Sequence, residues 1–360
     1  MKFKKNHKIS FLILSIVVSF FVVVTQISAA EISFSVNTKI PDNQIDKSKT
    51  YFNLKMKSNQ EQDVTVTLKN ETKKDITINI GINSAKTNKN GVIEYGKSTI
   101  KKDESLKYPL DSLMTGPSSV VVPASSSKDI TFHIKVPSKS FKGIVLGGLT
   151  FQQKSSEVLQ DSSKRNTTVQ NEYAYAVAVL LKESDDVVFP NLNLLKVKAG
   201  QDNYRNVINT TIQNTHAAIL SDVKVDAKVY SKNGADPVYS SVKNKIQIAP
   251  NTLWQYPISL NGTAMQSGKY RLHMQVTGIS DKKSKTWTFD KNFEITSTEA
   301  KALNKTDVDL KANTNNTSWV LFMMLSIIII LVAIILIGGT IWYRKKIKNG
   351  SNMNNTDKNK

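Results

Sequence analysis

Among the residues that could carry out acid–base chemistry or bind a metal, the four histidines come first, because the sequence has no cysteine. His7 falls in the N-terminal segment and His216 in the turn NTHAA, whereas His133 and His273 alternate with polar residues along strand-like stretches. None shows the paired spacing of zinc ligands or the setting of a buried general base oriented by a carboxylate. The sequence therefore predicts no metal site and no histidine-based active centre.

Serine could supply a nucleophile where it stands three residues before a lysine. This Ser-x-x-Lys spacing occurs at 125–128, 221–224 and 280–283, but no Lys-Thr-Gly accompanies it. A chain rich in serine and lysine produces such spacings by chance. Acidic pairs such as Asp185 and Asp186 are adjacent and lack the spacing of a calcium loop. We therefore predict a protein that is not an enzyme and needs no cofactor.

The two ends of the chain predict where it is located. Residues 1–30 combine a basic start, an apolar stretch and small residues ending in Ala30, which is typical of a cleaved secretory signal; an uncleaved membrane anchor is the alternative. Residues 319–343 carry no charge and are long enough for a transmembrane helix. The basic tail 344–360 is then cytoplasmic, and the chain between signal and helix lies outside, within the cell wall. Without a Leu-Pro-x-Thr-Gly sorting motif, we expect the membrane alone to hold the protein.

The net charge also depends on this division of the chain. Of the total of +20, the signal carries four lysines and the tail a net +5, which leaves +11 on the part predicted to be outside. A positive surface attracts polyanions; if the cell is a Gram-positive bacterium, the abundant polyanions outside it are teichoic acids and phospholipid head groups. A surface merely kept soluble by scattered lysines is the alternative. No nucleic-acid partner is expected, because no basic-aromatic recognition motif is present.

Apolar and polar residues alternate with a period of two through much of the chain. The clearest stretches are VTVTL, ITINIGI, ITFHIKV, VKVDAKV and YRLHMQV, separated by turn residues such as NKNG and SKNG. This pattern predicts half-buried antiparallel strands. The fold class predicted is all-β, with two immunoglobulin-like β-sandwich domains in addition to the signal peptide and the C-terminal transmembrane helix.

Composition suggests where the domains begin and end. The first sandwich is placed at 31–153 and the second at 169–296, with a Ser-rich, charged linker at 154–168 between them. Residues 297–318 are polar and are predicted to form a disordered stalk before the helix. No stretch outside the signal and the anchor shows a persuasive helical period.

The two halves follow a similar plan. In each, a strand ends in an asparagine, Asn70 or Asn214, and a later strand is preceded by a proline, Pro123 or Pro250. The repetition is weak in sequence but consistent in order, which favours two domains of one type.

The stretch FKGIVLGGLTFQQ at 141–153 contains Gly143, Gly147 and Gly148 within an apolar run. No lysine of a phosphate-binding loop follows the glycines. We predict a strand that closes the first sandwich, in which glycine allows a bulge or a close neighbour.

Residues 51–96, together with this glycine-rich stretch, resemble the N-terminal domain of the WxL-interacting proteins of Gram-positive bacteria. The motifs are the run from Ala85 to Tyr95, Ala-Lys-Thr-Asn-x-x-Gly-Val-Ile-x-Tyr, and Gly-x-x-x-Gly-Gly at 143–148. NEYAYAVAVLLKE at 171–183 and the residues that follow are similar to the second domain of that family. The resemblance implies a first domain that binds peptidoglycan, a second domain that binds host proteins, and association with WxL-type surface proteins.

For a ligand site we predict Asn83, Thr87, Asn88 and Tyr95, because amides, a hydroxyl and an aromatic face suit a sugar or a stem peptide. A β-hairpin turning at Asn90-Gly91 is the alternative role of these residues. The function predicted is a membrane-anchored, non-enzymatic cell-surface scaffold of adhesin type. The alternatives are a sensor signalling through its helix, which the short tail disfavours, and a wall-modifying enzyme, which only surface Ser and Lys would support.

Overall fold

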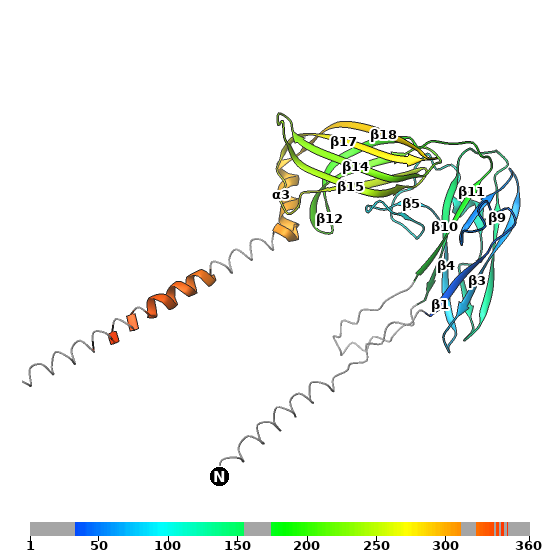
Figure 1. The fold of residues 1–360 in the computed structure, drawn as a ribbon, viewed down its shortest axis with the longest axis horizontal. Coiled ribbons are helices and arrows are strands. Elements are labelled where there is room, and N and C mark those ends of the chain that lie inside the picture. The colour runs from blue at the N-terminus through cyan, green and yellow to red at the C-terminus, as the bar shows by residue number, and fades with distance from the viewer. Residues whose placement is uncertain are drawn as a thin grey trace, which may run out of the picture.

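The computed structural model describes residues 33–154, 174–310, 322–334, 336–337, 340–341 and 344. The chain forms two domains built from strands, joined at an angle (Figure 1). The predicted all-β class is thereby confirmed. The predicted signal at 1–30 and nearly all of the predicted linker and cytoplasmic tail lie outside the described residues.

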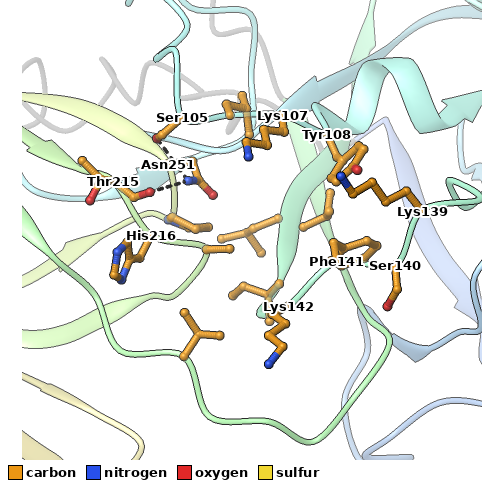
Figure 2. Close-up of a pocket in the computed structure, with 17 residues that line it drawn as sticks. Ser105, Lys107, Tyr108, Lys139, Ser140, Phe141, Lys142, Thr215, His216 and Asn251 are labelled. Carbon is orange, nitrogen blue, oxygen red and sulfur yellow. Dashed lines mark hydrogen bonds between the residues drawn. The ribbon is translucent and has the colours of Figure 1, made fainter.

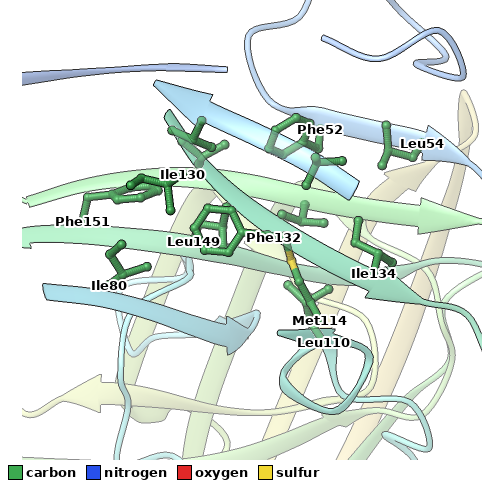
Figure 3. Packing of buried hydrophobic residues seen from close by; sticks show 14 of the residues in the cluster. Phe52, Leu54, Ile80, Leu110, Met114, Ile130, Phe132, Ile134, Leu149 and Phe151 are labelled. Carbon is green, nitrogen blue, oxygen red and sulfur yellow. The ribbon is translucent and has the colours of Figure 1, made fainter. Parts of the chain in front are cut away.

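The first domain consists of two sheets that share one core. The four-stranded sheet has the order β1-β3-β9-β7 and contains β1 (Phe34–Lys39), β3 (Glu61–Asn70), β9 (Ser127–Lys135) and β7 (Met114–Thr115). The five-stranded sheet has the order β2-β11-β10-β4-β8 and contains β2 (Phe52–Lys55), β11 (Ala174–Lys182), β10 (Val145–Gln153), β4 (Ile76–Ser84) and β8 (Ser119–Val122). Alternate residues of these strands point into the core. Phe132 of one sheet packs edge-on against Phe151 of the other, with their ring centroids 6.3 Å apart (Figure 3).

The second domain also has two sheets around one core. Its three-stranded sheet has the order β12-β13-β16 and contains β12 (Leu192–Asp202), β13 (Arg205–Asn214) and β16 (Thr252–Ser259). Its four-stranded sheet has the order β15-β14-β17-β18 and contains β15 (Pro237–Ile248), β14 (Leu220–Ser231), β17 (Gly268–Ser280) and β18 (Lys283–Ile295). Trp254 and Tyr256 of β16 are the largest side chains of its core.

The strand orders of the two domains correspond. Strands β1-β3-β9 match β12-β13-β16, and β8-β4-β10-β11 match β15-β14-β17-β18, in the same chain order. The first domain differs by adding β2, β7 and a long connection at 85–118 between β4 and β8. That connection contains β5 (Lys86–Thr87), β6 (Ile93–Glu94) and α2 (Leu110–Leu113). In the second domain, only residues 232–236 join β14 to β15.

The two predicted asparagines occupy the same position in this shared plan. Both are fully buried. Asn70 donates through Nδ2 to the carbonyls of Lys74 and Val122 at 2.8 and 3.0 Å, and its Oδ1 accepts from the Thr72 N–H at 2.9 Å. Asn214 repeats this set, donating to Ala218 and Ala249, both at 2.9 Å, and accepting from the His216 N–H at 3.3 Å. The predicted similarity of the two halves is confirmed at these residues.

Strand β11 corrects the predicted position of the domain boundary. The sequence placed 169–182 in the second domain, but β11 pairs antiparallel with β10 and parallel with β2 in the first. The chain leaves the first domain only after Lys182. The described connection between the domains is therefore 183–191 rather than 154–168.

The start of the predicted stalk is helical instead of disordered. α3 (Ser297–Thr306) begins with a capping box, in which the Thr296 hydroxyl accepts from the Glu299 N–H at 3.2 Å and the Glu299 carboxylate accepts from the Thr296 N–H at 3.0 Å. Ala300 packs into the core of the second domain, and Asp307, 1% exposed, accepts from the Asn206 N–H at 2.8 Å. Residues 311–318 lie outside the described part.

Parts of the predicted transmembrane segment are described. Residues 322–334, 336–337 and 340–341 are helical. Among the described residues, no helix is both long and apolar enough to cross a bilayer.

Candidate functional site

The β5–β6 hairpin of the first domain lies against the second domain (Figure 1). Its turn is built by Asn88, whose Oδ1 accepts from the N–H groups of Asn90 and Val92 at 2.9 and 3.1 Å. Gly91 has φ of +76°, and a Cβ there would lie 2.6 Å from the Ile246 side chain of the second domain. The Gly91 carbonyl accepts from the Gln247 N–H at 2.8 Å. Glycine is thus required both for the turn and for the contact between domains.

Further contacts fix the two domains against each other. The backbone N–H of Ile144 donates to the carbonyl of Ala217 at 2.9 Å. Gln213 donates to the carboxylate of buried Asp103 at 2.8 Å. A small apolar cluster contains residues of both domains: Ala85, Ile93, Tyr95, Leu146, Leu180, Ile219 and Ala249. The junction therefore combines apolar burial with hydrogen bonds that link defined atoms.

Three of the four predicted ligand residues lie in or beside this hairpin. Thr87 is fully buried, and its Oγ1 accepts from the Ala249 N–H at 2.8 Å. Asn88 builds the turn, as described above. Tyr95 packs on Gly148, since a Cβ added to Gly148 would lie 2.7 Å from the Cβ of Tyr95. Burial raises the pKa of the Tyr95 phenol. These contacts agree with the alternative role as a hairpin, and a role in ligand binding stays a prediction.

The fourth, Asn83, lies on β4 opposite Gly148 of β10. Its Nδ2 is buried and has no hydrogen-bond partner among the described residues.

The glycine-rich stretch forms β10, which lies between β4 and β11 and is therefore an inner strand and not the last one of its sheet. A Cβ at Gly147 would lie 2.5 Å from Leu110, and one at Gly143, where φ is +81°, would lie 2.3 Å from the carbonyl oxygen of Ala217. The predicted close neighbours are therefore confirmed. They are Leu110 and Tyr95 from the 85–118 connection, and Ala217 from the second domain.

A pocket of about 480 Å³ opens where the two domains meet (Figure 2). The first domain lines it with residues 105–108, 139–142 and 144–146, and the second with 215–217 and 250–251; Val188 of the connection completes it. A volume of this size is within the range of small-molecule sites, about 300 to 1,000 Å³, which are common at domain interfaces.

One wall of the pocket is a hydrogen-bonded polar group. Asn251 donates through Nδ2 to the Ser105 hydroxyl at 3.1 Å and to the Thr215 carbonyl at 3.0 Å, which joins the two domains across the wall (Figure 2). Asn251 has a left-handed backbone, with φ of +48°, a conformation that asparagine adopts more readily than most residues.

The opposite wall is aromatic. Tyr108 and Phe141 pack with ring centroids 5.7 Å apart. Glu183, the first residue after β11, holds the loop beneath them, because its Oε2 accepts from the Phe141 N–H at 3.1 Å and from the Ser140 hydroxyl.

The charged groups that line the pocket are all cationic. They are Lys107, Lys139 and Lys142, and no aspartate or glutamate lines it. Lys142 lies 3.7 Å from Asp186, whereas the ammonium groups of Lys107 and Lys139 have no partner among the described residues. Among the same residues, no group of three or more His, Asp or Glu is gathered so that it could hold a metal ion.

Comparison with known families matches both domains. The peptidoglycan binding domain of WxL Interacting Protein matches residues 34–153, and the host binding domain of WxL Interacting Protein matches residues 164–305. The second match includes β11, which the sheet assigns to the first domain. No curated protein matches the chain.

Solved structures match only distantly. The class 5 fimbriae chaperone CfaA is 16% identical with a TM-score of 0.29, over 67% of this chain and 96% of that chain. The E. coli chaperone DraB is 11% identical with a TM-score of 0.27, over 73% of this chain and 98% of that chain. The Pseudomonas aeruginosa CupB2 chaperone is 12% identical with a TM-score of 0.26, over 64% and 91%.

The two family matches follow one another in the expected order and together cover both domains. This chain belongs to the family of WxL-interacting proteins.

Proposed function

We propose that this protein is a non-enzymatic, membrane-anchored protein of the cell surface whose first domain binds peptidoglycan. The observation that carries the proposal is the match of residues 34–153 to a peptidoglycan binding domain, followed directly by the match to a host binding domain. The signal-like residues 1–30 and the apolar segment 319–343 support export and anchoring. Two immunoglobulin-like sandwiches would then stand outside the membrane, within the wall.

In the same proposal the second domain contacts protein partners. These are WxL-type surface proteins, as the family name implies, and host extracellular proteins, as the name of the matched domain implies. The long strand β18 borders its sheet and is available to a partner on its outer face, where Thr286, Thr288 and Asn292 are exposed. Cross-linking on intact cells, followed by identification of the captured chain, tests this part.

The peptidoglycan part is tested by sedimentation. The full-length chain in mild detergent is mixed with purified peptidoglycan from which teichoic acid has been stripped. The amount of protein in the pellet is compared with that of an unrelated protein that has one transmembrane helix and a similar net charge. We expect the chain to pellet with the wall at 0.5 M salt, where attraction by its net positive charge alone is screened beyond about 4 Å. Recovery no greater than that of the control would contradict the proposal.

A further inference from the structure

We propose that the pocket at the junction of the two domains binds a carboxylate-bearing stem peptide of the cell wall, held jointly by both domains. This inference rests on the proposed binding of peptidoglycan, and it adds the part of the polymer that is recognised, the place where it binds and the need for the second domain.

The charge of the pocket selects an anion. Three ammonium groups border it without a carboxylate among the lining residues, and those of Lys107 and Lys139 have no partner in the described part of the chain. Figure 2 shows Lys107 and Lys142 at opposite ends of the group of lining side chains. All three lysines are exposed, so the carboxylates of a ligand can reach them, and a charge-assisted hydrogen bond to an ammonium is stronger than a bond between neutral groups.

The interior of the pocket selects a ligand with small apolar groups. The apolar lining residues include Leu106, Ile144, Leu146 and Pro250, and the aromatic wall is Tyr108 with Phe141. The alanine methyls of a stem peptide would cover this surface, while its carboxylates reach the lysines. A polyol phosphate chain, as in teichoic acid, has the negative charge but little apolar surface, so it would leave the apolar interior of the pocket exposed to water.

The pocket is already formed without a ligand. The Ile144–Ala217 and Ser105–Asn251 hydrogen bonds both cross from one domain to the other at lining residues. Glu183 fixes the loop that carries Lys139 and Phe141. Walls fixed in this way lower the entropy that a ligand must lose on binding.

The test uses the full-length chain in detergent and a synthetic pentapeptide, N-acetyl-L-Ala–γ-D-Glu–L-Lys–D-Ala–D-Ala, whose blocked N-terminus leaves it a net negative charge, with binding measured by calorimetry. The pocket variant is Lys107→Met with Lys139→Met. The matched control is Lys73→Met with Lys74→Met, which removes the same charge from an exposed turn before β4, at the end of that strand away from the junction. Unchanged melting temperatures show that both variants fold.

We expect the pocket variant to weaken peptide binding by about tenfold or more, since it removes two charge-assisted hydrogen bonds to carboxylates, and the control by less than about twofold. Amidating the carboxylates of the peptide should weaken binding to the wild type in the same way. Equal weakening by both variants would overturn the inference, as would a polyol phosphate that binds with the same lysine dependence while the peptide does not.

Sedimentation with intact peptidoglycan separates this inference from the proposed function. If the pocket variant pellets with the wall as the wild type does, the pocket is not the wall site although the wall is still bound. If the wild type itself does not pellet, the proposed function fails and the inference fails with it.

Discussion

The two domains share one strand order, but the first has a much longer connection between β4 and β8, and this connection supplies a large part of the junction with the second domain. Where the second domain turns from β14 to β15 within residues 232–236, the first inserts 85–118 between β4 and β8. The insertion supplies the hairpin that docks on the second domain, buried Asp103, and Lys107 and Tyr108 of the pocket. Shared residues thus maintain each domain, and the added segment creates the junction and its pocket.

The largest effect is expected from the feature that the domains share. Asn214→Ala removes the side-chain donor from the buried carbonyls of Ala218 and Ala249, and Asn70→Ala removes it from the buried carbonyl of Val122. Each substitution should lower the free energy of unfolding by about 2 to 4 kcal/mol. Denaturant unfolding measures the loss, and hydrogen exchange should locate it in the domain that carries the substitution.

Asn244→Ala is the control, because this asparagine is exposed on the edge strand β15. If Asn70→Ala and Asn214→Ala cost no more than this control, the two asparagines do not have the structural role assigned to them.

A smaller effect is expected where the domains differ, at the hairpin turn. Gly91→Val places a β-branched side chain at a left-handed position and against Ile246, which should cost about 1 to 3 kcal/mol and release the hairpin from the second domain. Amide exchange at Gln247 should then become faster, because its acceptor is the Gly91 carbonyl. Gly96→Ala is the matched control, since a Cβ at Gly96 meets nothing within 4 Å.

Thr87→Val changes the same junction by one hydroxyl while keeping its shape. The buried N–H of Ala249 loses its acceptor, so docking should weaken by about 1 to 2 kcal/mol. Hydrogen exchange at the Ala249 amide should become faster in the valine variant, and Thr87→Ser should restore most of the protection of this amide against exchange. An unchanged Ala249 amide in the valine variant would show that this bond does not hold the domains together.

These comparisons also explain what the sequence could predict. The strands and the matching positions of Asn70 and Asn214 were predictable, because alternation with period two and a strand-ending asparagine are local patterns, whereas the hydrogen bonds of the two asparagines to Val122 and Ala249 join distant segments. The place of β11 was not, because its sheet depends on pairing with β10 and β2 at long range. The capping box at Thr296 and Glu299 was a readable signal for α3, although few apolar residues support that helix.

The pocket was beyond sequence reasoning for a similar reason. Lys107, Phe141 and Asn251 come from three separate segments, and Asn251 reaches the other two only because the domains dock. The predicted ligand residues were instead close in sequence, and the structure uses two of them, Thr87 and Asn88, to build the docked hairpin. The one available hint was the mismatch in length between the connections of two otherwise similar halves.

The smallest effect concerns how the chain leaves the last strand of each domain. After β11, hydrogen bonds from Lys182 and Lys55 lower the pKa of Asp185 to about 2; after β18, hydrogen bonds from Thr296 lower the pKa of Glu299 at the start of α3. A carboxylate whose pKa is lowered by folding stabilises the folded state above its unfolded value, 3.8 for Asp185, and that contribution is lost as the pH falls toward about 2. Both side chains are exposed to solvent, so each contribution is small.

Asp185→Asn should therefore narrow the difference in melting temperature between pH 5 and pH 2, whereas Asp42→Asn, at a fully exposed aspartate, should leave it unchanged. If the wild type and Asp185→Asn lose stability equally over this range, the ion pairs at the exit of the first domain do not contribute, and Glu299→Gln then tests whether the capping box at the exit of the second does.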